Sequence, residues 1–454
     1  MMLRRGISTT ALVGIMVVLI IIVGVGAYFA GYNAAAGAPQ TTTVTTTVVS
    51  TVTQTVTQTV TATATVSPSP TPPPTTTTPP TPTTTPPAVG KKVAILFDVG
   101  GRGDLSFNDM AWLGAENARK DFGVEVDYIT PKSLADMVPL LESLSKKGEY
   151  AVLVLVGFLW TQPLEEVAPK YPQQKFALID AATSKDYPNV ANFVFREQEI
   201  ASLIGVLASD IAYHLGTNKI GAVAGMDIPP LWKFHIGYLF GAKYYEKKTG
   251  RSIEFVWIYT GTFTDPAKGK ETALQMIQQD VRVIYGLAGA THLGAFEAVK
   301  EMSEKGVLSF AIGQDASQEW IDPHHIFLSG MKRVDVAVYT AIKMAISGEF
   351  KGGTYSLGIK EGGHDIADLD TVRWFAELAA ETGRLKDMTP DDVVNIVKSM
   401  REKYISEEAW SIVEEIKQKI INGEIKFKFP KTHEEYEQII NELMKGNLDA
   451  ALEK

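Results

Sequence analysis

The feature of this chain that most constrains its fold is a regular alternation, after Lys91, of short apolar runs with amphipathic segments. The runs at 93–97 and 151–156 contain no polar residue. A strand of this kind is buried on both faces, which is typical of a parallel sheet covered by helices on both sides. We therefore predict an α/β fold that begins at Lys91.

The alternation occurs twice along the chain. We predict the first series of strands at 93–97, 124–129, 151–156 and 176–179, with helices at 109–122, 133–146 and 198–214. We predict the second series of strands at 219–224, 253–259, 283–286, 309–312 and 326–329, with helices at 233–249, 269–279 and 295–305. Two series of similar length predict two doubly wound lobes, with a hinge and a cleft at the carboxyl ends of their strands.

The lobe boundaries follow from the two series. We expect lobe 1 at about 91–205 plus 314–340, and lobe 2 at about 206–313 plus 341–430. The helical, charged segment 370–421 is expected to pack on lobe 2, and 431–454 is expected to form a C-terminal helical tail.

Residues 1–32 favour attachment to a membrane. Arg4 and Arg5 precede an apolar run at 11–30, and a run of roughly 20 residues suits a transmembrane helix. Basic residues on its N-terminal side place that end in the cytoplasm and the rest of the chain outside the cell. In the alternative interpretation, Arg5-Gly6-Ile7-Ser8 resembles an archaeal class III signal, which is cut after the glycine.

Residues 33–90 are expected to be a disordered linker. The segment is rich in threonine and proline, and no charged residue occurs from Gly6 to Gly90. Without aromatic residues from 41 to 87 it has nothing to seed a core. A proline-rich chain extends by about 3.1 Å per residue, so the linker could hold a binding domain on the order of 100 Å from an archaeal cell membrane.

Composition excludes several kinds of function. The net charge of −9 argues against a nucleic-acid partner, because phosphate binding needs a basic face. With no cysteine in the chain, disulfides and thiolate chemistry are excluded. His214, His235 and His292 lack metal-ligand spacing, and no nucleophile and base form a recognisable pair. We therefore expect that the protein binds no cofactor and is not an enzyme.

Polar and aromatic residues gather directly after the predicted strands. The first such loop, 98–108, contains Asp98, Phe107 and Asn108. It lacks the Gly-Lys-Ser/Thr of a phosphate loop and the third glycine of a dinucleotide-binding loop. Flat rings that stack on a flat ligand, with carboxylates that accept bonds from hydroxyl groups, suit a nucleoside or an aromatic glycoside.

Several ordered motifs resemble the basic membrane protein family, also called PnrA-like, of ABC-transporter substrate-binding proteins. They are the loop 98–108, Gly157-Phe158, 171–180, 195–208, 261–270, Gly313-Gln314-Asp315 and 329–335, and 422–426 resembles the family's closing strand. The resemblance covers about 91–430. It implies a type I periplasmic-binding-protein fold, purine nucleosides as the ligand class, and an ABC permease and ATPase as partners.

The resemblance also implies roles for individual residues. The implied ligand-binding residues are Asp98, Ser106, Phe107, Asn108, Asp180, Phe263, Gly286, Gly289, Asp315 and Lys332, with Trp160, Trp232 and Phe234 as weaker candidates. Two phenylalanines would sandwich the base, one from each lobe: Phe107 and Phe263. Asp98, Asn108 and Asp180 would bond its edges. Asp315 and Lys332 would bind the ribose hydroxyls, and Gly286 or Gly289 would let the backbone come close to the ligand.

This sequence departs from the family pattern at 314–317, which reads Gln-Asp-Ala-Ser, and in the bulk of Trp160 and Trp232. Two other functions stay open at this point. A sensory ectodomain would bind a small aromatic solute and signal through a partner. A nucleoside hydrolase would need a metal near Asp98 and Asp104, between which Gly100, Gly101 and Arg102 intervene.

The N-terminal residue of the mature protein separates the anchor from the class III signal. We expect an uncut chain, in which Arg4 and Arg5 remain on the cytoplasmic side of the apolar run. Intact-mass and N-terminal peptide analysis of the purified protein measures this directly. A mature chain that starts at Ile7 would contradict the anchor.

Overall fold

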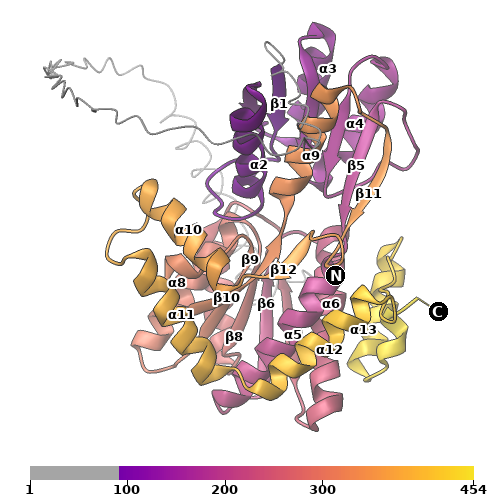
Figure 1. The fold of residues 1–454 in the computed structure, drawn as a ribbon. Coiled ribbons are helices and arrows are strands. Elements are labelled where there is room, and N and C mark those ends of the chain that lie inside the picture. The colour runs from indigo at the N-terminus through magenta and orange to yellow at the C-terminus, as the bar shows by residue number, and fades with distance from the viewer. Residues whose placement is uncertain (1–91, 454) are drawn as a thin grey trace, which may run out of the picture. The chain divides into compact units, whose positions relative to one another are not determined.

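Two six-stranded sheets form the framework of residues 92–453, the part of the chain that a computed structural model describes (Figure 1). The expected anchor and the whole of the expected linker lie outside the described residues. Between residues 92 and 453, no helix has both the length and the apolar character needed to cross a membrane.

The first sheet has the strand order β11-β5-β4-β3-β1-β2, and all of its pairings are parallel. Its strands are β1 (Lys92–Leu96), β2 (Glu125–Ile129), β3 (Tyr150–Val156), β4 (Phe176–Ile179), β5 (Val190–Phe195) and β11 (Gly353–Leu357). Its helices are α2 (Phe107–Phe122), α3 (Met137–Lys147), α4 (Thr161–Val167) and α9 (Val334–Ser347).

The second sheet repeats this arrangement in the order β12-β10-β9-β8-β6-β7, and only β12 runs antiparallel to its neighbour. Its strands are β6 (Lys219–Ala224), β7 (Glu254–Tyr259), β8 (Val283–Leu287), β9 (Phe310–Asp315), β10 (Ile326–Lys332) and β12 (His364–Ile366). Its first helices are α5 (Glu197–His214), α6 (Pro229–Thr249), α7 (Pro266–Gln278) and α8 (Ala290–Glu304), and the C-terminal ones are α10 (Leu369–Glu381), α11 (Pro390–Tyr404), α12 (Glu407–Ile421) and α13 (His433–Met444).

Both faces of the sheets are buried, as the continuous apolar runs predict. In β1, Val93 and Ile95 belong to the large core shared with α5 and α6, whereas Ala94 and Leu96 belong to a separate core on the other face, under α3 and α4. All four side chains are inaccessible to solvent. Successive residues of a strand point to opposite faces, so both layers of helices are needed to cover such a strand.

The chain passes between the lobes at three places: at Arg196 between β5 and α5, at Arg333 between β10 and α9, and at 358–363 between β11 and β12. The expected lobe boundaries were therefore wrong in part. Only the last part of segment 314–340 belongs to lobe 1, because β10 pairs with β9 and β12 in the second sheet. Only α9 and β11 return to the first lobe.

Close helix packing explains where α9 goes. It lies against α2, where a Cβ on Gly114 would stand 2.2 Å from the carbonyl oxygen of Asp335. Only glycine permits this approach, so Gly114 allows α9 to pack against α2 in the first lobe. In the second lobe, Gly237 and Gly241 of α6 permit the same closeness to α5, since their Cβ atoms would lie 2.3 and 2.0 Å from carbonyl oxygens of that helix.

The predicted strands and helices of both series are present, with bounds that differ by a few residues, and α10 to α12 pack on the second lobe. The prediction omitted β5, β11, β12, α4 and α9. The expected closing strand at 422–426 was wrong. Asn422 ends α12, and the segment after it contributes a single bridge, between Phe427 and Leu452.

Candidate ligand-binding site

A cavity lies between the two lobes, at the carboxyl ends of strands from both sheets. Its lining residues are Asp98, Gly100, Asp104, Phe107, Asn108, Gly157, Phe158, Leu159, Asp180, Ile228, Pro230, Leu231, Phe234, Phe263, Leu287, Gly289, Gln314, Asp315 and Lys332. Most of the lining follows strands directly, as expected for the ligand site of a doubly wound sheet. Apolar rings and aliphatic chains form its walls, and carboxyl, amide and ammonium groups meet at one region of it.

Two aspartates occupy equivalent places in the two lobes. Asp180 follows β4 and Asp315 ends β9, and β4 and β9 are the third strands of their respective sheets. Each residue has a φ of 72°, in the left-handed region that aspartate tolerates better than most residues. This backbone turn directs both carboxyl groups into the cavity, one from each side.

Two phenylalanines reach the cavity from opposite lobes. Phe107 is the first residue of α2, and its ring lies beside Gly157, whose Cβ would be 3.7 Å from the ring. Phe263 follows β7, and its ring covers Gly225 so closely that a Cβ there would be 2.1 Å away. Glycine at 225 is therefore what lets the Phe263 ring lie flat against the end of β6.

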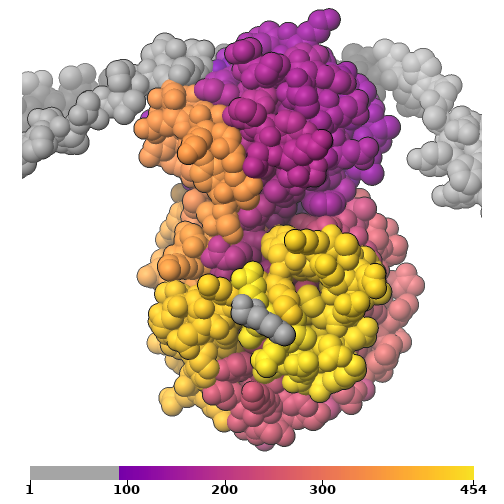
Figure 2. Space-filling view, turned by 90° about the vertical axis from the view of Figure 1, so that its right-hand side faces the viewer, coloured from indigo at the N-terminus to yellow at the C-terminus, as the bar shows by residue number. Residues whose placement is uncertain are grey.

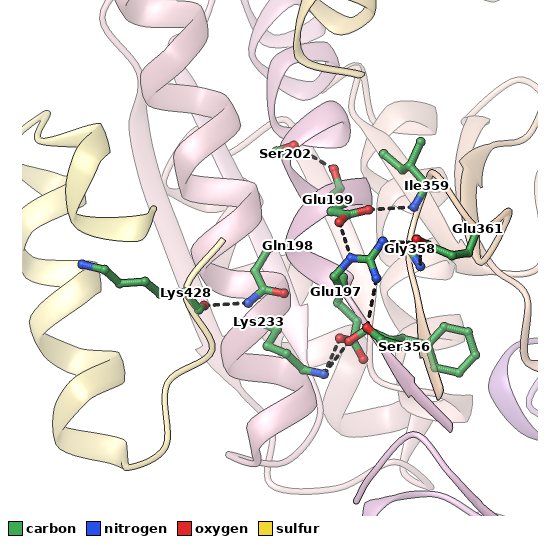
Figure 3. Close-up of polar contacts among 12 residues, drawn as sticks. Glu197, Gln198, Glu199, Ser202, Lys233, Ser356, Gly358, Ile359, Glu361 and Lys428 are labelled. Atoms are coloured by element: carbon green, nitrogen blue, oxygen red, sulfur yellow. Dashed lines mark hydrogen bonds and ion pairs between the residues drawn. The ribbon is translucent and has the colours of Figure 1, made fainter. Parts of the chain in front are cut away.

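A buried ion cluster lies at the polar region of the cavity. The Lys332 ammonium is 2.6 Å from Asp180 Oδ1 and 2.9 Å from Glu197 Oε1. On the other side of Glu197, the Lys233 ammonium is 2.5 Å from Oε2 (Figure 3). The rings of Phe107, Phe195 and Phe234 surround Lys332 with their centres 5.0–5.5 Å from its Nζ.

Burial and mutual charge set the protonation of this cluster. Burial raises the pKa of Asp180 to about 8, against the attraction of Lys332, and the charge of Glu197 adds to the rise. Burial acts on Glu197 as well, but the two ammonium groups outweigh it and lower its pKa to about 2. For Lys332, burial alone would lower the pKa, yet the surrounding carboxylates raise it. The ammonium therefore stays charged.

A carboxyl–amide pair forms a second polar region. Asn108 Nδ2 donates to Asp98 Oδ1 at 3.0 Å, and the amide of Gly100 donates to the same oxygen at 2.8 Å. Burial raises the pKa of Asp98, partly offset by these hydrogen bonds. Asn108 Oδ1 is buried and has no hydrogen-bond partner among the described residues. This region therefore offers a ligand one free acceptor and a carboxyl that is readily protonated.

Asp104 holds the start of α2 in place. Its carboxylate accepts hydrogen bonds from the backbone amides of Ser106, Asn108 and Asp109 at 2.9–3.1 Å. Burial nevertheless raises its pKa to about 7. By fixing the first turn of α2, Asp104 fixes the positions of both Phe107 and Asn108.

Hydrogen bonds join the two lobes beside the cavity. The Ser106 hydroxyl donates to Asp315 Oδ2 at 2.6 Å, and Gln318 Nε2 donates to the carbonyl oxygen of Leu105 at 3.0 Å. The loop before α2 is thereby attached to the end of β9. Ser106 does not line the cavity, and its contact with the site is through Asp315.

The expected site residues can now be placed. Those that line the cavity are Asp98, Phe107, Asn108, Asp180, Phe234, Phe263, Gly289, Asp315 and Lys332. Gly286 does not, because a Cβ there would meet the His292 ring at 3.0 Å, so this glycine makes room for a histidine.

The two tryptophans do not line the cavity either. Trp160 is fully buried in the first lobe and donates its indole N–H to the carbonyl oxygen of Phe97 at 3.1 Å. Trp232 lies on α6 and stacks on Tyr436. Both are packing residues.

Some lining residues were not among the expected ligand-binding residues. Five of them lie at or just after the ends of strands, where the sequence predicts the cleft: Gly157, Phe158, Leu159, Leu287 and Gln314. Ile228, Pro230 and Leu231 lie at the start of α6, which begins four residues earlier than predicted. No motif or spacing in the sequence marks Glu197 and Lys233 as members of the ion cluster.

Comparisons with known proteins show which family this chain resembles. The sequence model of the family described as "ABC transporter substrate-binding protein PnrA-like" matches residues 91–380. An uncharacterized lipoprotein of Pyrococcus horikoshii is 65% identical over 364 residues, which are 80% of this chain and 90% of the relative. The ABC transporter nucleoside-binding protein BmpA of Lactococcus lactis is 31% identical over 292 residues, 61% of this chain and 81% of that protein.

A solved structure has the same fold. The solute-binding protein of an ABC transporter system from Aeropyrum pernix K1 superposes with a TM-score of 0.79 at 60% sequence identity. The match covers 80% of this chain and all of that one. The predicted two-lobed α/β fold is thereby confirmed.

Replacing Lys332 by methionine tests the buried ion cluster. We expect Lys332→Met to lower the free energy of unfolding at pH 8 by about 3–5 kcal/mol, because it leaves buried carboxylates without their partner. Burial raises the pKa of Asp180, so this carboxyl binds a proton in the folded state as the pH falls from 8 to 5. The deficit relative to wild type should therefore be smaller at pH 5, as measured by urea unfolding at both pH values.

Lys417→Met is the matched control, because Lys417 pairs at 2.8 Å with an exposed carboxylate, Asp365. Its loss should stay below about 1 kcal/mol. Equal losses in the two variants, or a Lys332→Met deficit independent of pH, would contradict the account of the cluster.

Proposed function

Because the chain belongs to the PnrA-like family of ABC transporter substrate-binding proteins, we propose that its interlobe cavity captures a purine nucleoside for delivery to an ABC permease. The observation that carries the proposal is the pair of phenylalanine rings, Phe107 and Phe263, which enter one cavity from opposite lobes. A substrate-binding protein needs no chemical step, and we propose none.

The two rings suit a flat base. Aromatic side chains on both sides of a heterocycle stack on its faces whatever its substituents, so stacking supplies affinity and the edges supply specificity. Asn108 Oδ1 has a free acceptor position for a ring N–H or an exocyclic amine. The raised pKa of Asp98 favours a protonated carboxyl, which could donate to a ring nitrogen or carbonyl.

The ion cluster suits a ribose. An ammonium group has three N–H donors, and two of those of Lys332 face Asp180 and Glu197, which leaves one for a hydroxyl oxygen. Asp315 already accepts from Ser106 and Gln314, but each carboxylate oxygen has a second lone pair that can accept from a ribose hydroxyl.

Two relatives support parts of this proposal. The BmpA protein of Lactococcus lactis is a nucleoside-binding protein by its name, and the Pyrococcus horikoshii relative is named a lipoprotein. For this chain we propose a binding domain outside the cell, held at the membrane by the apolar run at 11–30 and the linker that follows. An ABC permease and its ATPase would be the partners.

Replacing the stacking rings tests the proposed ligand. We expect Phe107→Ala and Phe263→Ala each to weaken binding of inosine or adenosine by about 1–3 kcal/mol, which is about 5- to 150-fold in Kd. Isothermal titration calorimetry measures this. Phe350→Ala is the control, since Phe350 is a partly buried phenylalanine outside the lining. Wild-type affinity in both cavity variants would contradict the stacking role.

A further inference from the structure

The C-terminal segment 427–453 folds into a closed clip on the second lobe. Its two ends meet in a β-bridge between Phe427 and Leu452. The backbone amide of Lys428 donates to the carbonyl oxygen of Ala451 at 2.8 Å, and the backbone amide of Glu453 donates to the carbonyl oxygen of Lys426 at 2.8 Å. Between these ends lie α13 and a short helical turn, Leu448–Ala451. Figure 2 shows this segment, in yellow, spread over the second lobe. It lies outside the residues that the family model matches.

One residue of the clip, Tyr436, contacts α6 and β7 at once. Its ring is stacked on Trp232 with centres 5.4 Å apart and an angle of 12°. Its hydroxyl lies 2.7 Å from His235 Nδ1 and 3.0 Å from the hydroxyl of Tyr259. Burial lowers the pKa of His235 to about 3, so this histidine is neutral and its Nδ1 can accept a hydrogen bond from the tyrosine hydroxyl. Only 5% of Tyr436 is exposed.

The residues of α6 that contact Tyr436 lie on the same turns as residues that line the cavity. Trp232 and His235 face the clip, whereas Leu231 and Phe234, one residue before each, line the cavity. Residues three apart lie on one side of a helix, so the two pairs form neighbouring stripes on the same two turns. A displacement of these turns away from α13 would move Leu231 and Phe234 with them.

A second contact leads from the clip to the ion cluster. The Phe429 ring covers Lys233, whose Nζ is 4.5 Å from the ring centre. Lys233 is only 2% exposed; its ammonium pairs with Glu197 and donates to the carbonyl oxygen of Phe195 at 2.8 Å. Beside it, Gln198 Nε2 donates to the carbonyl oxygen of Lys428 at 3.0 Å (Figure 3). Glu197 in turn holds Lys332 in the cavity.

We propose that the clip positions the second-lobe wall of the ligand cavity, with Tyr436 and Phe429 as its positioning residues. Tyr436 fixes the first turns of α6, and Phe429 keeps water from Lys233 and so preserves the pairing that orients Glu197 and Lys332. Neither residue lines the cavity. The ligand half of this inference rests on the proposed nucleoside-binding function, and the structural half does not.

Two measurements on the full-length chain test the proposal, with Tyr436→Ala and Phe429→Ala as variants. Without ligand, hydrogen exchange of the amides at 228–236 should accelerate at least tenfold in Tyr436→Ala. With inosine as probe, dissociation should become about 5- to 50-fold faster in both variants. Tyr436→Phe keeps the stack on Trp232, so its exchange rate at 228–236 and its inosine dissociation rate should lie between those of Tyr436→Ala and wild type.

The control is Ile416→Ala, which removes a fully buried side chain from α12, a helix that packs on α5. It should lower the thermal midpoint about as much as Tyr436→Ala yet leave exchange at 228–236 and inosine dissociation close to wild type. Equal behaviour of Ile416→Ala and Tyr436→Ala in both measurements would overturn the proposal, since the clip would then contribute stability alone.

The exchange measurement separates this inference from the proposed function. If the wild-type chain binds no nucleoside but exchange at 228–236 accelerates in Tyr436→Ala, the nucleoside assignment fails and the positioning of α6 stands. If inosine binds the wild type and all variants alike, the positioning role fails and the nucleoside assignment stands.

Discussion

The rest of this structure depends on the ion pairs that the buried ammonium of Lys332 makes. Lys332 ends β10, one residue before the chain crosses to the first lobe, and it pairs with Asp180 of the first lobe and Glu197 at the start of α5. A charge buried at this depth is tolerated only with several compensating partners. The requirement for those partners brings the end of β4, the start of α5 and the end of β10 to one point.

That point combines two of the crossings between the lobes with the proposed binding site. The cluster joins residues at two of the three crossings between lobes, and Ser106 and Gln318 add hydrogen bonds across the cavity. Closure of such lobes around a ligand is an established kind of domain motion. Because the carboxyl groups of Asp98, Asp180 and Asp315 line the cavity, a ligand rich in N–H and O–H donors fits the proposed site better than an anion does.

Much of the fold and part of the site could be predicted from sequence, for physical reasons that particular residues make clear. Uninterrupted apolar runs such as 93–97 predict strands buried on both faces, and the rule that ligands bind at strand ends led to the loop with Asp98, Phe107 and Asn108. The family resemblance implied Asp180, Asp315 and Phe263. Glu197 and Lys233 could not be found this way, because they start or lie within helices and their importance depends on pairing across the fold. Trp232 was a weaker candidate for ligand binding, but it stacks on Tyr436, and sequence does not reveal that α13 covers this part of α6.

The most direct test of the central claim is thermal unfolding of the full-length chain with inosine, adenosine, guanosine, cytidine, uridine, ribose and free adenine. A ligand that binds only the folded state raises the midpoint by mass action. The account predicts a rise with the purine nucleosides that exceeds the rise with ribose or adenine, because only a nucleoside uses both the rings and the ion cluster. It should also exceed the rise with pyrimidine nucleosides, because a two-ring base offers a larger area for stacking. A midpoint that no purine nucleoside raises would contradict it.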